Sequence, residues 1–402
     1  MTSDLSTRAL SPDAPMSDSA TAQAASRSQA RRVLFIINSL AGGGAERVMC
    51  TLLRASEAEQ RDCSIALLLL DREAAAYEVP AWVEVRQLDC RQSLIRSVWS
   101  VFHAMRQMRP AVTVSFLTRA NVANVIAAAI LRIPAIISER VDTSSHLGGG
   151  LGASVARRLV RATYPRARKV IAVSQGVADS LYARFGVMRE RTTVIANPID
   201  LDAIRAQAAR GAPLDLPIPY IVAGGRLMPN KNFPLLIDAF ARADIPETLV
   251  ILGEGPERAA LAEKIAALGL QNRVVMPGFI DNPFPTISRA ALYVSSSNAE
   301  GFPNALLEAM STSVPVIATN CPSGPAEVLA EMPRAQVGTG VTQAPHGLLV
   351  PPNDPAALAE ALRIMQAPEQ RRIYGERAAR RAADFGVQRA KDAYWEVIRA
   401  TL

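Results

Sequence analysis

The sequence predicts an α/β protein with two domains, each built on a parallel β-sheet covered by helices. Short apolar runs alternate with amphipathic helical stretches along the chain, which is the pattern of repeated βαβ units. At 402 residues the chain is also too long for one ordinary core. A stretch rich in Ala, Pro and Gly, residues 208–219, separates two such series, so we expect domains over residues 31–210 and 211–385.

In the first domain, continuous apolar runs predict strands that are buried on both faces. Helices are expected from residue 45 and over residues 93–108, and Ser174 is expected to be the N-cap of a third. The predicted strands are residues 33–37, 64–70, 83–88, 112–116, 135–138 and 170–173.

The second domain repeats the pattern, and right-handed βαβ crossovers imply a second parallel sheet. One helix is expected to begin near Asn232, and a last helix is expected over residues 386–402. The predicted strands are residues 220–223, 249–252, 274–276, 292–294 and 316–318.

Composition limits the expected compartment of the protein. Residues 1–30 are rich in Ser, Ala, Asp and Thr and lack an apolar signal core, so they are predicted to be a disordered tail. The four cysteines show no metal or disulfide spacing, which fits the reducing cytosol. No apolar run is long enough to span a bilayer, so any membrane contact is expected to be peripheral, at the inner face of the cytoplasmic membrane.

Positive charge is concentrated in the first half of the chain. Residues 1–210 carry 27 Lys and Arg against 18 Asp and Glu, while the remainder carries 17 against 19. No nucleic-acid recognition motif is present, so no nucleic-acid partner is predicted. The basic amphipathic segment at residues 154–169 instead predicts contact with an anionic membrane surface. A solvated helix that covers the core is the alternative interpretation.

Two carboxylates lie within the segment 297–310. Glu300 and Glu308 have seven residues between them, and a predicted strand precedes the first. Glu300 is therefore expected at the carboxyl end of a strand, where open α/β sheets bind ligands. Asn304 and Glu308 share one face of the following helix. A carboxylate accepts two charge-assisted hydrogen bonds well, and the cis-diol of a ribose offers two donors, so Glu308 is a candidate ribose ligand.

Two cations follow a diglycine turn upstream of this segment. Gly224 and Gly225 end a predicted strand and allow a tight turn. Arg226 and Lys231 then lie on the short loop before the next helix. Cations beside a helix N-terminus predict a diphosphate site, whereas two ordinary surface cations are the alternative.

These motifs in order resemble the C-terminal half of the retaining glycosyltransferases of family 4. The matching segments are residues 226–231, 253–257, 277–279 and 300–308. Residues 38–47 resemble the first loop of the same family, and residues 197–200 and 321–325 also match it. The resemblance runs from about residue 32 to the C-terminus. It implies the GT-B fold, in which two Rossmann-like domains face a central cleft and the last helix crosses back onto the first domain.

The resemblance also implies roles for the matched residues. Arg226 and Lys231 would stabilise the leaving diphosphate and Glu300 would lie near the ring carbon of the sugar, so these three are the predicted catalytic residues. The predicted donor-binding residues are Gly43, Gly44, Gly225, Glu254, Phe279, Gly301, Phe302, Asn304 and Glu308.

Residues of the first domain are predicted to meet the acceptor. Glu139 and Arg140 follow a predicted strand, and His146 precedes three glycines, so all three are expected on the cleft. The cleft loops lack a D-x-D motif, which predicts a metal-independent diphosphate site without a cofactor. The resemblance further implies a polyprenyl-diphosphate-linked acceptor, as in enzymes that build bacterial surface polysaccharides.

The predicted function is therefore the transfer of a sugar, with retention of configuration, from a nucleotide-diphosphate sugar to a hydroxyl group. Two alternatives remain open from the sequence. One is a nucleotide-sugar epimerase on the same architecture, and the other is a non-catalytic module that binds nucleotide sugars or lipids.

Overall fold

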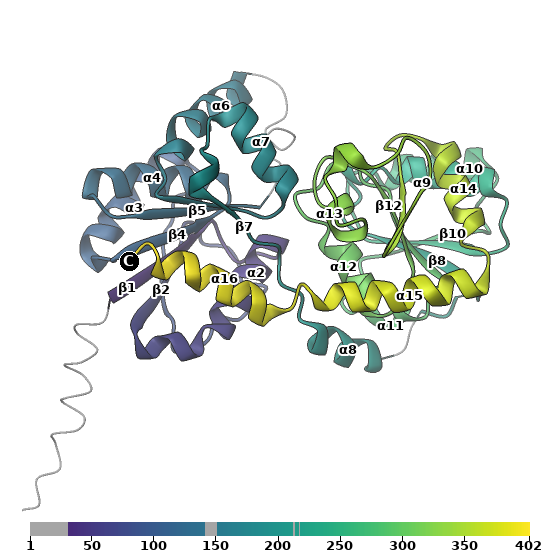
Figure 1. The fold of residues 1–402 in the computed structure, drawn as a ribbon, viewed down its shortest axis with the longest axis horizontal. Helices are drawn as coiled ribbons and strands as arrows, with labels where there is room; N and C mark the ends of the chain where they lie inside the picture. The colour runs from purple at the N-terminus through teal and green to yellow at the C-terminus, as the bar shows by residue number, and fades with distance from the viewer. Residues whose placement is uncertain (1–30, 141–150, 212–213, 217) are drawn as a thin grey trace, which may run out of the picture.

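The chain folds into two lobes, each with a seven-stranded sheet between layers of helices (Figure 1). This computed structural model describes residues 31–140, 151–211, 214–216 and 218–402. It confirms the predicted α/β class with two sheets dominated by parallel strands. The predicted tail, residues 1–30, lies outside the described residues.

The first sheet has the strand order β3-β2-β1-β4-β5-β6-β7, and every neighbouring pair is parallel. All six predicted strands are present, and no end is shifted by more than two residues. The short edge strand β7 was not predicted, because three residues are too few for an apolar pattern to stand out. The strands are β1 (Arg31–Ile37), β2 (Cys63–Leu69), β3 (Glu84–Gln87), β4 (Val112–Phe116), β5 (Ala135–Glu139), β6 (Lys169–Ala172) and β7 (Thr192–Val194).

The second sheet has the order β10-β9-β8-β11-β12-β14-β13. All five predicted strands are present, and β13 and β14 complete the sheet. The edge strand β13 is antiparallel to β14, so this sheet is not wholly parallel. The strands are β8 (Tyr220–Gly224), β9 (Thr248–Leu252), β10 (Val274–Gly278), β11 (Leu292–Ser295), β12 (Val316–Thr319), β13 (Thr342–Ala344) and β14 (Gly347–Val350).

Helices cover both faces of the first sheet, because alternate side chains of each strand point to opposite faces. Leu34 and Ile36 of β1 pack into the core beneath α3, α4, α6 and α7, whereas Phe35 and Ile37 pack towards α2 and α16. Ser174 caps α7, and its hydroxyl accepts a hydrogen bond from the Val177 N–H, as predicted. The helices are α2 (Gly44–Ala55), α3 (Leu94–Met108), α4 (Thr118–Leu131), α6 (Leu151–Thr163), α7 (Gln175–Phe185) and α16 (Val387–Arg399).

The second sheet is covered in the same way. Ile221 of β8 packs into the core with α9, α10 and α14, whereas Val222 packs into the core with α11, α12, α13 and α15. This latter core is continuous with the α3–α4–α6 core of the first domain. The helices are α9 (Phe233–Ala243), α10 (Arg258–Ala267), α11 (Phe284–Ser288), α12 (Asn304–Ser311), α13 (Pro325–Leu329), α14 (Pro355–Ile364) and α15 (Pro368–Ala383).

The chain crosses between the domains twice, and the two crossings lie side by side. The Ile199 N–H donates a hydrogen bond to the Phe385 carbonyl at 2.8 Å, and Ile199 pairs with Gly386 as an isolated parallel bridge. After the first crossing, α8 (Leu201–Ala209) packs against α11 and α12. It therefore belongs in space with the second domain, although the expected boundary at residue 210 places it in the first.

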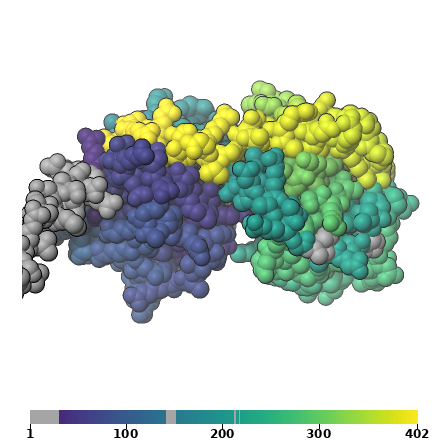
Figure 2. Space-filling model, turned by 90° about the horizontal axis from the view of Figure 1, so that it is seen from below, coloured from purple at the N-terminus to yellow at the C-terminus, as the bar shows by residue number. Residues whose placement is uncertain are grey.

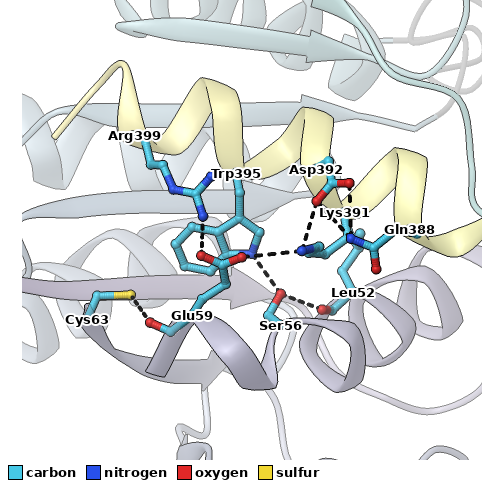
Figure 3. Close-up of polar contacts among 9 residues, drawn as sticks. All are labelled: Leu52, Ser56, Glu59, Cys63, Gln388, Lys391, Asp392, Trp395 and Arg399. Carbon is cyan, nitrogen blue, oxygen red and sulfur yellow. Dashed lines mark hydrogen bonds and ion pairs between the residues drawn. The ribbon is translucent and has the colours of Figure 1, made fainter. Parts of the chain in front are cut away.

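The last helix, α16, returns to the first domain after the second crossing (Figure 2). Buried polar contacts with α2 and with the 3-10 turn Glu57–Arg61 fix its position (Figure 3). The buried Glu59 carboxylate accepts from the Lys391 ammonium at 3.3 Å and pairs with the Arg399 guanidinium. The Trp395 indole N–H donates to the Ser56 hydroxyl at 2.8 Å. Hydrogen bonds to Asp392 and Glu59 raise the pKa of Lys391, so it stays charged in this site.

Glu59→Gln should loosen the docking of α16, because it leaves the buried Lys391 with a weaker partner. Removing one partner of a buried ion pair costs about 3–5 kcal/mol, and the neighbouring Asp392 places the expected loss at about 3 kcal/mol. Urea unfolding followed by Trp fluorescence measures this loss. The matched control is Glu57→Gln, an exposed residue of the same turn, and equal stability of the two variants would contradict the expectation.

Candidate active site

Three strand ends meet at the carboxyl edge of the second sheet. Gly225, Gly253 and Gly278 follow or end β8, β9 and β10, and all three have positive φ angles. The Gly253 N–H donates to the Gly278 carbonyl at 2.9 Å, and a Cβ on Gly253 would lie only 2.0 Å from the Gly225 carbonyl oxygen. Only glycine allows the two backbones to come this close. The glycines therefore fix the positions of the loops that carry the predicted donor site.

The predicted catalytic pair Lys231 and Glu300 lies at this edge. The Lys231 ammonium donates to the Glu300 carboxylate at 2.6 Å, and the Ser297 hydroxyl donates to the same oxygen at 2.6 Å. Gly225 lies against the aliphatic part of Lys231 and leaves room for it. A pocket between β8 and β11 is lined by these side chains and by Tyr293. The structure thus brings together a cation and a carboxylate that are 69 residues apart.

The remaining predicted donor residues of the second domain surround this pair on loops. Arg226 is exposed, and within the described part of the chain its guanidinium has no hydrogen-bond or ion-pair partner. Phe279 is 72% exposed directly after β10. Glu254 pairs with Arg258 at 3.0 Å, and one of its oxygens lies against Gly278. These side chains are therefore accessible to a ligand at the sheet edge.

Helix α12 presents the predicted ribose ligand to the first domain. The Glu308 carboxylate pairs with the Arg47 guanidinium of α2, and the Asn304 side-chain oxygen accepts from the Asn197 side-chain amide at 2.7 Å. Burial raises the pKa of Glu308, while the charges of Arg47 and Lys231 oppose that rise. The helix face that was predicted to hold the donor is thus in contact with residues of the opposite domain.

The glycines of the first loop lie against this helix face. Gly44 begins α2, and a Cβ on it would lie 2.9 Å from the Asn304 side-chain amide. Gly43 is the N-cap of α2, and the Glu46 side chain folds over it. The prediction placed both glycines at the donor site, and the structure places them at the boundary between the domains, across from the donor-site helix.

Phe302 differs from its predicted position. Its side chain is buried and lies against Phe385, with ring centroids 5.7 Å apart, so it belongs to the core at the domain crossing, where it lines a pocket between residues of the two domains and not the sheet edge beside Lys231. The adjacent Gly301 carbonyl accepts a hydrogen bond from the Ser174 hydroxyl at 2.9 Å. An aromatic residue within a glycine–proline turn gives no sequence signal for which way its ring points.

Glu139 and Arg140 also differ from the prediction that they face the acceptor. Both are buried. The Glu139 carboxylate accepts from the Tyr164 hydroxyl, while Arg140 donates to the Tyr394 hydroxyl at 2.6 Å and to the Asn197 side chain. Burial lowers the pKa of Arg140, and interactions with Tyr394 and Glu139 oppose that change. The predicted acceptor-side residue His146 lies outside the described residues.

Sequence reasoning missed three residues that connect the cleft walls, namely Arg47, Asn197 and Tyr394. The first two lie within family-like segments, so their presence was visible. Their partners were not, because these contacts join residues 261, 107 and 254 positions away along the chain. Tyr394 links α16 to Arg140, which in turn holds Asn197 against the second domain.

Neither a metal centre nor a membrane-spanning helix is found among the described residues. They contain no group of three or more His, Cys, Asp or Glu side chains placed to hold a metal ion. None of the described helices combines the length and the apolar character needed to cross a bilayer.

Comparison with known proteins decides the family. Residues 42–203 match Glycosyltransferase Family 4, and residues 218–366 match Glycosyl transferases group 1. The chain belongs to the glycosyltransferase family that these two matches describe together, with a Glycosyltransferase Family 4 domain followed by a Glycosyl transferases group 1 domain. The two matches fall on the two lobes, and they confirm the resemblance that the sequence motifs indicated.

The relatives of this glycosyltransferase include two bacterial N-acetylgalactosaminyltransferases. It is 27% identical, over 89% of its length and 97% of the relative, to the N-acetylgalactosamine-N,N'-diacetylbacillosaminyl-diphospho-undecaprenol 4-alpha-N-acetylgalactosaminyltransferase of Campylobacter jejuni. A second N-acetylgalactosaminyltransferase of Campylobacter jejuni, which acts on a diNAcBac-PP-undecaprenol glycan, is 26% identical over 91% of this chain and 98% of the relative.

Solved structures show the same fold. Anabaena HepE in complex with UDP superposes with a TM-score of 0.71 at 22% identity, covering 92% of this chain and all of that one. The lipopolysaccharide outer core galactosyltransferase WaaB gives a TM-score of 0.71 at 18% identity with the same coverage. These neighbours establish that the glycosyltransferase has the GT-B fold.

Tyr394→Phe should weaken the connection between α16 and the cleft wall, because it removes one acceptor of the buried Arg140 guanidinium, which keeps its hydrogen bond to Asn197. Leaving a buried charged donor without its partner costs about 1–3 kcal/mol. Urea unfolding measures the change. The control is Tyr182→Phe, which removes a hydroxyl that has no hydrogen-bond partner among the described residues. A loss no larger than that of the control would show that the Tyr394 hydroxyl is dispensable.

Proposed function

We propose that the protein is a retaining glycosyltransferase that moves a sugar from a nucleotide-diphosphate sugar to a hydroxyl group of a lipid-linked acceptor. The observation that carries this proposal is the cluster at the carboxyl ends of β8 and β11. There Lys231 contacts Glu300 at 2.6 Å, and the Arg226 guanidinium has no hydrogen-bond or ion-pair partner within the described chain. Ligands of open α/β sheets bind at this edge.

The proposed reaction exchanges one bond at the anomeric carbon for another. The bond from this carbon to the diphosphate oxygen breaks, and the acceptor oxygen forms its bond on the same face of the sugar. The proton of the acceptor hydroxyl passes to the departing phosphate, so the products are the glycosylated acceptor and a nucleoside diphosphate. The transition state resembles an oxocarbenium ion, as in the cleavage of glycosidic bonds.

Two cations serve this reaction by stabilising the leaving group. Negative charge grows on the diphosphate as the bond breaks, and cations that are already in position stabilise it without reorganisation. Glu300 and Ser297 hold the Lys231 ammonium at the sheet edge. The Arg226 guanidinium offers a planar fork that suits a phosphate. The site needs no metal in this proposal.

The nucleoside is proposed to lie between the β10 loop and α12. The exposed Phe279 and the loop at Glu254 would border the base, and the Glu308 carboxylate would accept from the ribose diol. Uridine is the first candidate, because the HepE structure with the same fold contains UDP. The undecaprenol-linked substrates in the names of two full-length relatives support a polyprenyl-diphosphate acceptor.

Arg226→Ala and Lys231→Ala should each lower turnover by about 10²–10³-fold, because each removes charge stabilisation that grows in the transition state. The assay follows the release of nucleoside diphosphate from UDP-, GDP- and ADP-sugars with a polyprenyl-diphosphate-linked acceptor. Lys264→Ala, on the outer helix α10, is the matched control, because Lys264 pairs only with the surface residue Asp238 within the described chain. Near-normal turnover in both site variants would overturn the proposed diphosphate site. Isomerisation of the donor without acceptor would instead favour an epimerase.

The first domain is proposed to rest on an anionic membrane surface at the cytoplasmic side. Helix α6 carries Val155 and Leu159 on an outward stripe, and Val155 is 55% exposed. Two helices away along the same layer, α3 exposes Ile95 and Trp99, at 75% and 61%. α3 contacts α4, and α4 contacts α6. Exposed apolar side chains among arginines fit the boundary between lipid headgroups and acyl chains.

The double change Ile95→Ala and Trp99→Ala should weaken binding to vesicles that contain phosphatidylglycerol by about thirtyfold or more, since each side chain would lose apolar contact worth about 1 kcal/mol or more. Cosedimentation measures the bound fraction. Leu268→Ala removes an exposed apolar side chain from the second domain and is the control. Unchanged binding of the double variant would exclude α3 from the membrane contact.

A further inference from the structure

The contact between Arg47 and Glu308 joins the two domains across the cleft. Arg47 lies in the first turn of α2 and Glu308 in the second turn of α12. The guanidinium bonds one oxygen of the carboxylate, Oε1. The Glu308 side chain is only 14% exposed, whereas that of Arg47 is 42% exposed. A buried acid therefore depends on a cation that reaches it from the other domain and from a more accessible position.

The Glu308 carboxylate has few other groups that could pair with it. Within the described chain, Arg47 is the partner of its carboxylate, and Lys231 contributes only through its more distant charge. The Lys231 ammonium itself is bonded to Glu300. An unpartnered charge in a buried position is costly, so the cleft without a ligand favours the pair between Arg47 and Glu308.

A ribose and Arg47 would compete for the same carboxylate. A cis-diol that donates two hydrogen bonds to one carboxylate uses both oxygens, and Arg47 already donates to Oε1. Each oxygen can accept more than one hydrogen bond, but the Glu308 side chain is only 14% exposed, which leaves little open surface for a guanidinium and a diol together. The nucleoside is therefore expected to compete with Arg47 for this carboxylate.

We propose that Arg47 is a positioning residue that is displaced by the donor nucleotide. It holds Glu308 and the two domains together in the empty cleft, and the ribose takes its place when the nucleotide binds. This inference rests on the proposed role of Glu308 as the ribose ligand. According to this proposal, the contact between Arg47 and Glu308 forms when the nucleotide site is empty and breaks when a nucleotide binds.

The other contacts across the cleft do not require Glu308. The amides of Gln175 and Gly176 donate to the Glu327 carboxylate at 2.7 and 2.9 Å, and Asn197 donates to Asn304 at 2.7 Å. The domains therefore stay connected when Arg47 leaves. Displacement of Arg47 frees a cation on α2, beside the glycines of the first loop, without separating the lobes.

The predicted sign of the Arg47→Ala effect makes the inference testable. Removal of a cation near the site would by general electrostatics weaken the binding of an anionic nucleotide. If Arg47 competes with the nucleotide for Glu308, its removal tightens binding instead, because the nucleotide no longer has to displace it. For a partly exposed pair we expect about two- to fivefold tighter binding.

The experiment measures the Kd of UDP, GDP and ADP by isothermal titration calorimetry for the wild type, for three test variants and for one control. The test variants are Arg47→Ala, Glu308→Gln and the double variant. Arg54→Ala is the matched control, because Arg54 is exposed in the last turn of the same helix. Glu308→Gln should weaken binding by about tenfold or more, since it loses charge-assisted hydrogen bonds to the ribose. In that background, Arg47→Ala should no longer tighten binding.

The outcomes separate this inference from the proposed function. If Glu308→Gln weakens binding but Arg47→Ala leaves it unchanged or weakens it, the displacement of Arg47 is wrong and the ribose assignment stands. If Glu308→Gln leaves binding unchanged, or none of the three nucleotides binds the wild type, the donor site in the proposed function is wrong, and the inference fails with it. Tighter binding in both the wild-type and the Glu308→Gln backgrounds would show that Arg47 acts through another group, which also overturns the inference.

Discussion

The arrangement of the whole molecule depends on the place where its two domain crossings meet. The backbone hydrogen bond from Ile199 to Phe385 ties the chain that leaves the first domain to the chain that returns to it. Apolar packing surrounds this point, because Ile199 and Phe302 are buried there and Phe302 lies against Phe385. The crossing sets how the carboxyl edges of the two sheets face each other, and every contact across the cleft follows from it.

The contacts further into the cleft are of a different chemical kind. Among the described residues they consist of hydrogen bonds and one ion pair, from Ser174, Gln175, Gly176, Asn197 and Arg47 to the second domain. A polar contact that opens exchanges its partner for water at small net cost, whereas apolar surface that opens is exposed to water at a cost that grows with its area. The molecule therefore combines an apolar hinge with polar walls, which suits an enzyme that must admit and release a large charged substrate.

Much of the fold could be predicted from the sequence because its determinants are local. Apolar runs marked the central strands, and Ser174 marked the start of α7. The edge strands β7 and β13 were missed because three-residue strands carry too little pattern. Lys231 and Glu300 could be placed at one edge because every βα loop of a parallel sheet lies at its carboxyl edge.

The partners of the site residues could be predicted less well, because they are set by how the two halves of the chain meet. Arg140 follows a strand, and the sequence gives no sign that Tyr394, from the last helix, buries and binds its side chain. Glu308 similarly meets Arg47 of the opposite domain. The sequence predicted where a residue lies along its helix, strand or loop. It did not predict which way the side chain points, because that direction depends on residues far away in the chain.

The docking of α16 also has a consequence for how the protein is made. Tyr394, Trp395 and Ile398 fill the core between β1 and α2, so the first domain contains a piece that is translated after the whole second domain. During synthesis the apolar surface beneath this helix stays open while some two hundred further residues emerge from the ribosome at about 5–20 residues per second. The first domain is thus the first to begin folding and the last to be completed, and for tens of seconds it presents a surface that chaperones recognise.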